Sequence, residues 1–180
     1  MDTLQRMELD ELLEMTAHIP RDTFAESVDP FCLVVEIPGE CSEDQAPVFV
    51  LPHKDTLESG GGFRRCAPKA KGQYALFLRK QDDSSHRDMY TVGRSSSCDL
   101  TIPHMSISKQ HAYLQNRKGE FLLHDPSSTN GTFVEGTQVE STQGISVKST
   151  TAIRFGDVAT YLFSSIDLYD YLDVIRRSRE

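Results

Sequence analysis

Three polar segments carry side chains suited to holding an anion with several acceptor oxygens. The segments are GRSSSCD (93–99), SISKQHA (106–112) and HDPSSTNGTFVEG (124–136). Together they offer a guanidinium, an ammonium, two hydroxyls and a carboxamide, from Arg94, Lys109, Ser108, Thr129 and Asn130. Two cations with several hydrogen-bond donors suit the charge and shape of a phosphate group. A carboxamide both donates and accepts hydrogen bonds, so Asn130 also suits a peptide backbone.

Other residues of these segments are suited to building the loops. Gly131 can supply a positive φ, and the Asp125 carboxylate can bond the backbone of its own loop. His111 stands at the start of an apolar run, where we expect it to hydrogen-bond neighbouring backbone and hold a loop. Ser108 and His111 also have the residue types of a nucleophile and a base. No G-x-S-x-G elbow accompanies them, so the sequence does not predict an enzyme.

Short apolar runs that must position these segments fill residues 73–164. Residues typical of turns separate the runs, and the apolar residues show no helical period. This spacing predicts an all-β sandwich. Loops gather at the two ends of a sandwich, so segments far apart in the sequence can converge there. The runs are QYALFLRK, DMYTVGRS, DLTI, HAYLQ, FLLHD, FVEG, GISVKS, AIRFG and TYLFS.

The flanking segments predict an N-terminal extension over 1–72 and a main domain over 73–180 that ends in a helix at 166–179. A helix is predicted over 3–17, with Leu9, Leu12, Leu13 and Thr16 on one face and Asp2 or Thr3 as its cap. At the other end Ser165 can cap the C-terminal helix. Short strands are predicted at 31–37 and 46–51, and a glycine-rich connector at 59–72.

Charge and composition limit the classes of partner. The chain has 180 residues and is 38% hydrophobic, which is enough for one ordinary hydrophobic core. Its net charge of −8 does not fit a protein that binds nucleic acid through a broad basic face. A basic run within 64–71 is the one weak candidate for nucleic acid, and a solvated linker is the favoured alternative. No apolar run approaches the roughly 18 residues of a membrane span. The acidic start predicts no signal peptide.

The four cysteines indicate reduced thiols in a cytoplasmic protein. Cys32, Cys41, Cys66 and Cys98 have irregular spacings and no C-x-x-C pattern, so no zinc site or other metal site is predicted. A single disulfide stays open as the alternative.

Two motifs in the main domain resemble the signature of forkhead-associated domains. The first is G-R-x4-D-x2-I-x4-I-S-K-x-H-A, from Gly93 to Ala112, and the second is D-x-S-S-T-N-G-T, from Asp125 to Thr132. The likeness covers the chain from about residue 73 onward and leaves 1–72 unmatched. It implies a β-sandwich of about eleven strands that binds phosphothreonine peptides through loops at one end.

The resemblance also implies a role for each matched residue. Arg94 and Ser108 match phosphate ligands, Lys109 assists them, Thr129 lies beside the phosphate and Asn130 holds the ligand backbone. Gly93 and His111 match scaffold residues. Ser106 stands where the family often selects a ligand residue, but it carries no charge, so no preference follows from it.

The expected function is therefore a phosphothreonine-peptide-binding module that acts as a cytoplasmic adaptor in serine/threonine kinase signalling. Its partner would be a phosphothreonine-containing protein or peptide, either a kinase or a kinase substrate. No cofactor, nucleic acid or membrane is expected. The alternative is an interaction scaffold of the same fold that binds its partners without phosphate.

Overall fold

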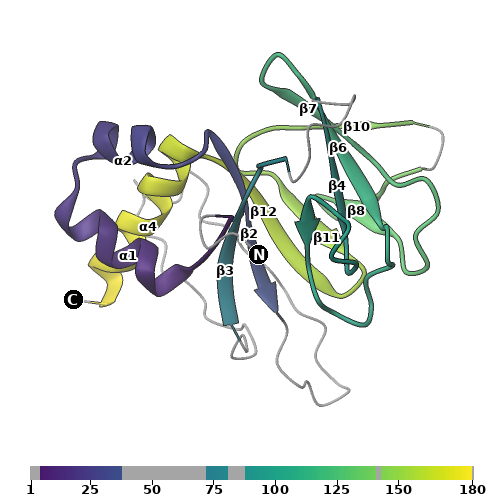
Figure 1. Ribbon diagram of the computed structural model, residues 1–180, viewed down its shortest axis with the longest axis horizontal. Coiled ribbons are helices and arrows are strands. Elements are labelled where there is room, and N and C mark those ends of the chain that lie inside the picture. Colours follow the sequence, from purple (N-terminus) through teal and green to yellow (C-terminus); the bar gives the residue numbers. More distant parts are fainter. Residues whose placement is uncertain (1–4, 38–71, 81–87, 141–142, 180) are drawn as a thin grey trace.

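Two β-sheets pack face to face in the computed structural model, which describes residues 5–37, 72–80, 88–140 and 143–179 (Figure 1). The larger sheet has the strand order β1-β3-β2-β12-β11-β8-β9, and the smaller has the order β10-β7-β6-β4-β5. The predicted all-β sandwich is thus confirmed. The strands are β1 Arg6–Glu8, β2 Phe31–Ile37, β3 Gly72–Phe77, β4 Met89–Gly93, β5 Leu100–Thr101, β6 Ala112–Arg117, β7 Glu120–His124, β8 Thr132–Val134, β9 Thr137–Gln138, β10 Ile145–Val147, β11 Ala152–Phe155 and β12 Val158–Ser164.

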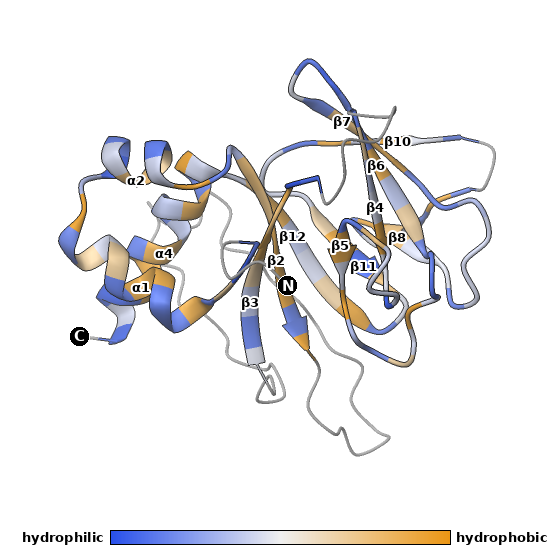
Figure 2. Ribbon diagram, viewed as in Figure 1, coloured by the Kyte–Doolittle hydropathy of each residue, from blue (hydrophilic) through white to orange (hydrophobic). Residues whose placement is uncertain are grey.

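The main core lies between the two sheets. Leu33 and Val35 of β2 point into it, and they meet Leu114 of β6 and Leu123 of β7 from the opposite sheet. All four side chains are fully buried. In strands with one buried and one solvated face, burial alternates from one residue to the next, and β6 and β7 follow that pattern. Figure 2 shows the apolar residues gathered along the inner strands.

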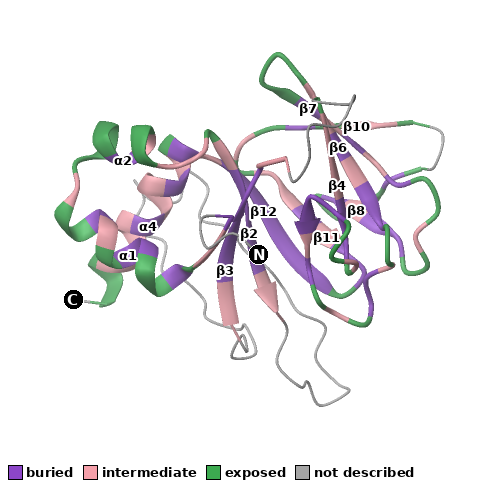
Figure 3. Ribbon diagram, in the orientation of Figure 1, coloured by how far each residue is buried: buried purple, intermediate pink, exposed green. Residues whose placement is uncertain are grey.

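Within the described residues, a layer of three helices covers the outer face of the larger sheet (Figure 3). Cys32 and Val34 of β2 point toward this layer, so β2 is buried on both faces and its sequence is almost continuously apolar. Among the described residues, none of the helices has the length and apolar character needed to cross a bilayer. The helices are α1 Leu9–His18, α2 Arg21–Ser27 and α4 Ser165–Arg179.

The first helix confirms the predicted apolar face but not the predicted start. Leu9, Leu12, Leu13 and Thr16 are its buried residues. Arg6–Glu8 form strand β1 against β3, so the helix begins at residue 9 and not at residue 3. The cap predicted at residue 2 or 3 lies outside the described residues. Helix α2 was not predicted, because its seven residues bury only Phe24 and show too short a pattern.

The C-terminal helix begins at Ser165, one residue before the predicted start at 166, and the capping side chain is therefore Ser164. The Ser164 hydroxyl accepts a hydrogen bond from the Asp167 N–H at 3.1 Å and donates one to the Asp167 carboxylate at 2.7 Å. This reciprocal pair satisfies a free backbone N–H at the start of the helix. Leu168 and Leu172 are buried against the sheet, as their spacing predicts.

Strand β2 joins the predicted N-terminal extension to the sandwich. It lies between β3 and β12, with Cys32 opposite Phe77 on one side and Phe163 on the other. Extension and main domain therefore share one sheet, and residue 72 is not an edge of the fold. Residue 72 itself begins β3. The strand predicted at 46–51 and the rest of the connector lie outside the described residues.

A chain shortened to 72–180 should fail to fold, because it loses β2 from the interior of the larger sheet. A chain shortened to 28–180 keeps β2 and loses only the edge strand β1 and the helices α1 and α2, so it should retain a cooperative transition at a lower melting temperature. Circular dichroism during heating measures both. A cooperative transition near the full-length melting temperature in the 72–180 chain would contradict the shared sheet.

Candidate functional site

The end of β4 places Arg94 against the segment that carries Ser108. The Arg94 N–H donates to the Ser108 carbonyl at 3.0 Å, and the Ser95 N–H donates to the Lys109 carbonyl at 3.1 Å. A side chain at Gly93 would overlap that Lys109 carbonyl and also crowd Cys98. Glycine is therefore required there so that the two backbones can approach each other.

Two hydroxyls meet where the second and third polar segments converge. The Thr129 N–H donates to Ser108 Oγ at 3.1 Å, and the Ser108 hydroxyl donates to Thr129 Oγ1 at 3.3 Å. Thr129 is exposed and Ser108 is half-buried. The pair leaves the Thr129 hydroxyl hydrogen available to a molecule that approaches from solvent.

His111 holds these two segments together from below. It is fully buried, and its Nδ1 accepts a hydrogen bond from the Ser108 N–H at 3.0 Å. Because an N–H can only donate, the imidazole proton is on Nε2, which faces the Gly131 carbonyl at 3.2 Å. Burial lowers the pKa of His111 below its ordinary value, which keeps the ring neutral. The predicted loop-holding contacts are present.

Hydrogen bonds within the third polar segment hold its loop in shape. The Asp125 carboxylate accepts hydrogen bonds from the Ser128 N–H at 2.7 Å and the Ser128 hydroxyl at 2.6 Å. Burial acts to raise the pKa of Asp125, but the hydrogen bonds to its carboxylate, chiefly those from Ser128, and nearby charge together lower the pKa. Gly131 has a φ of 77°, the left-handed conformation that its residue type predicts.

Asn130 is anchored at one end of its carboxamide. Its Nδ2 donates to the Ser106 carbonyl at 2.8 Å, so the amide plane is fixed relative to the second segment. The side chain lies at the surface. The carbonyl oxygen of the amide accepts no hydrogen bond from the described residues and remains able to accept one from a ligand.

The cations of the site have no carboxylate partner among the residues that the structure describes. Arg94 and Lys109 are exposed and form no ion pair there. Several cations elsewhere in the described chain do pair, as Arg21 with Asp170 at 2.6 Å and Arg79 with Asp29 at 2.7 Å. A guanidinium and an ammonium left exposed beside two hydroxyls form a site of positive potential suited to a multivalent anion.

All three predicted segments therefore meet at one end of the sandwich, and each predicted residue lies in them. The sequence did not predict the role of Cys98, whose thiol donates to the Lys109 carbonyl at 3.2 Å and supports the loop from inside. It also did not predict that Ser106 is a buried support. In an irregular loop, buried and exposed residues do not alternate with a regular period. The sequence therefore gives no indication that Cys98 and Ser106 are buried. Within the described residues no cluster of His, Cys, Asp and Glu is arranged to hold a metal ion.

The family model of the FHA domain matches residues 90–156. The chain contains an FHA domain. The matched range includes the three loop segments of the site and strands β5 to β11 in full.

Relatives of this FHA domain occur in much longer proteins. The chain is 38% identical to human Kanadaptin over 82 residues, which cover 39% of this chain and 11% of Kanadaptin. It is 30% identical to the Arabidopsis thaliana FHA domain-containing protein PS1 over 77 residues, which cover 42% of this chain and 5% of that protein.

A solved FHA structure overlaps a larger share of the chain. The yeast Dun1 FHA domain, determined in complex with a doubly phosphorylated peptide, shares 20% identity with a TM-score of 0.45. The overlap covers 74% of this chain and 72% of the Dun1 chain.

Replacing His111 should weaken the fold and change its response to acid. Because the pKa of His111 is lowered by folding, the unfolded chain binds more protons once the pH falls below the ordinary value of 6.5. His111 therefore adds stability that is complete above that pH and is lost as the pH falls toward the folded pKa. His111→Ala should lower the free energy of unfolding by about 1–3 kcal/mol at pH 7.5, through the unpaired groups it leaves, and by less at pH 5.

Urea unfolding at both pH values measures this difference, and His18→Ala is the matched control. His18 is exposed at the end of α1, so removal of its side chain should cost little stability. An equal loss of stability at both pH values for His111→Ala would contradict a neutral, buried imidazole in the folded chain.

Proposed function

We propose that this chain binds phosphothreonine peptides through its FHA domain and serves as a cytoplasmic adaptor in serine/threonine kinase signalling. The observation that carries the proposal is the meeting of the Ser108 and Thr129 hydroxyls beside Arg94 and Lys109, which are exposed and form no ion pair with the described residues. The Dun1 FHA domain, solved with a doubly phosphorylated peptide, supports the same class of ligand.

The proposed mechanism is reversible capture of a phosphate group that carries a charge of about −2 at neutral pH. Arg94 donates from a planar guanidinium that can engage two phosphate oxygens, and Lys109 adds a mobile positive charge. The hydroxyls of Ser108 and Thr129 donate to the same group, and Asn130 bonds the peptide backbone. An affinity near micromolar, about −8 kcal/mol, is ordinary for such a site.

We propose binding without catalysis, and the bonds of His111 support this choice. A serine nucleophile needs a base whose ring nitrogen accepts its hydroxyl proton. Here Nδ1 of His111 accepts the Ser108 backbone N–H, and Nε2 faces the Gly131 carbonyl. Both ring nitrogens are occupied by the scaffold, so neither is directed at the Ser108 hydroxyl.

The partner is proposed to be a kinase or a kinase substrate that carries the phosphothreonine. A cytoplasmic location agrees with the free, buried thiols of Cys32 and Cys98. The rival function is a scaffold that binds without phosphate. The unpaired cations disfavour it, because a surface that needs no anion gains nothing from leaving them together.

Replacing Arg94 should abolish most phosphopeptide binding and leave the fold intact. Arg94→Ala removes at least one charge-assisted hydrogen bond, worth about 1.5–3 kcal/mol, so affinity should fall at least about tenfold. The melting temperature should stay unchanged because the side chain is exposed and has no ion pair within the part of the chain that the structure describes. Calorimetry with a phosphothreonine peptide selected from a library, and with its unphosphorylated form, gives both affinities.

Arg117→Ala is the matched control for net charge. Arg117 is also exposed, but it ends β6 at the opposite end from Ala112 and the site. Its loss should leave affinity within about twofold, because a contact a whole strand away is screened by salt. Equal affinities for phosphorylated and unphosphorylated peptide in the wild-type chain would favour the scaffold and reject the phosphate site.

A further inference from the structure

The turn between β11 and β12 is bonded to both loops that carry the hydroxyls of the site. The Gly156 N–H donates to the Gly131 carbonyl at 3.0 Å, in the third polar segment. The Asp157 N–H donates to the Ser106 hydroxyl at 3.0 Å, in the second polar segment. Two consecutive backbone N–H groups of one turn therefore connect it to the second and the third segment, although the turn follows both of them in the sequence.

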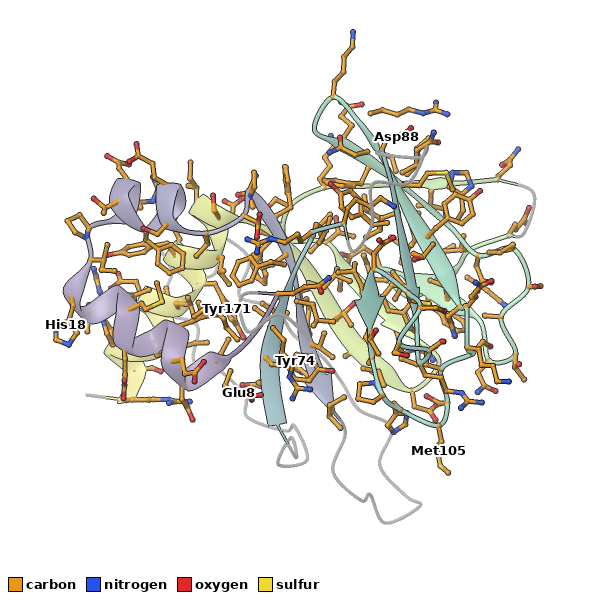
Figure 4. All side chains as sticks on the ribbon, viewed as in Figure 1. Glu8, His18, Tyr74, Asp88, Met105 and Tyr171 are labelled. Atoms are coloured by element: carbon orange, nitrogen blue, oxygen red, sulfur yellow. The ribbon has the colours of Figure 1, made fainter. Side chains whose placement is uncertain are left out.

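Ser106 connects this turn to Asn130. It is only 6% exposed, whereas the adjacent Met105 is 91% exposed and projects away from the body of the protein (Figure 4). The Ser106 hydroxyl accepts the Asp157 N–H and also bonds His104 Nδ1 at 2.8 Å. Its carbonyl accepts the Asn130 Nδ2 at 2.8 Å. Ser106 is thus bonded to the turn through its side chain and to the Asn130 carboxamide through its backbone.

Gly156 leaves the Ser106 carbonyl in place because it has no side chain. A Cβ at this position would lie 2.5 Å from the Ser106 carbonyl oxygen and 2.8 Å from the Ser106 hydroxyl oxygen, well inside van der Waals contact. The φ of Gly156 is 56°, in the left-handed region that favours glycine. The oxygen that a side chain would displace is the acceptor of the Asn130 carboxamide.

A side chain of β11 also holds the turn. The Arg154 guanidinium donates to the Gly156 carbonyl, and its Cζ lies 3.8 Å from the centre of the Phe133 ring on β8. A guanidinium over an aromatic ring is attracted by the negative face of that ring. Strand β8 begins directly after Gly131, so the turn is fixed relative to the third segment by a side chain as well as by the backbone.

We propose that Gly156 and Asp157 are positioning residues of the peptide-binding site, which orient the Asn130 carboxamide through Ser106. The inference rests on the proposed function, in which Asn130 bonds the ligand backbone. A carboxamide that is held in one orientation before the ligand arrives loses less conformational entropy on binding. The turn between β11 and β12 therefore raises the affinity for the peptide without contacting it.

The test is a double-mutant cycle on the full chain, with calorimetry of the phosphothreonine peptide used for Arg94→Ala. Gly156→Ala should weaken binding about three- to tenfold, the range expected when one fixed neutral hydrogen bond is lost. In an Asn130→Ala background the same replacement should change affinity by less than about twofold, because the carboxamide that it would misplace is absent. Equal fold losses in the two backgrounds would overturn the positioning role.

Gly119→Ala is the matched control for backbone strain. Gly119 has a φ of 90° in the turn between β6 and β7, and a Cβ there would meet no other described residue within 4 Å. Its replacement should lower the melting temperature through the same left-handed strain and leave affinity within about twofold. A loss of affinity equal to that of Gly156→Ala would assign the effect to strain alone and reject the role of the turn.

The order of the Asn130 carboxamide in the free chain gives a readout that needs no ligand. Nitrogen relaxation of the Asn130 side chain should show an ordered amide in the wild-type chain and a more mobile one in Gly156→Ala. Ser106→Ala is the second variant, for use where Gly156→Ala does not fold. It removes the acceptor of the Asp157 N–H and keeps the backbone carbonyl, so it should also loosen the amide.

An amide that is equally ordered in the wild-type chain and in these variants would overturn the positioning role and leave the proposed function standing. Absence of phosphate-dependent binding by the wild-type chain would overturn both.

Discussion

The neutral imidazole of His111 is the link on which the proposed site depends. It accepts a hydrogen bond from one loop and faces the carbonyl of another, and these two loops carry the two hydroxyls that meet at the site. The His111 N–H donates to the Val92 carbonyl at 2.8 Å, and the edge of the ring packs on Phe155. The ligand-facing loops are therefore anchored in the core between the sheets, although their own side chains are exposed.

Much of the sandwich could be predicted because its strands are short, apolar and separated by turn residues. The site could also be predicted from the sequence. Binding of an anion requires particular polar and cationic residue types, and the backbone geometry of the loops requires glycine at particular positions. Gly93 allows a close approach of two backbones, and Gly131 adopts a positive φ. Requirements of this kind restrict the residue type at a single position. They can therefore be recognised in the sequence without knowing which residues lie nearby in the fold.

Features that depend on contacts distant in sequence could not be predicted. The sequence of β2 indicates a strand, but nothing in it says that the strand lies between β3 and β12. Arg6–Glu8 continue the helical pattern of α1 and yet pair with β3, because tertiary pairing overrides a weak local preference. Met105 and Ser106 differ completely in exposure, and only the folded turn decides which of the two faces solvent.

The central place of β2 also determines when the sandwich can finish folding during synthesis. Cys32 pairs with Phe163, about 130 positions later, so the larger sheet cannot close until β12 has left the ribosome. Until then β2, whose residues Cys32 to Val35 are buried in the finished fold, is an apolar strand with an open edge. A nascent chain of this kind is a natural client of chaperones that shield apolar segments, and ribosome stalling ahead of β12 would leave it prone to aggregate.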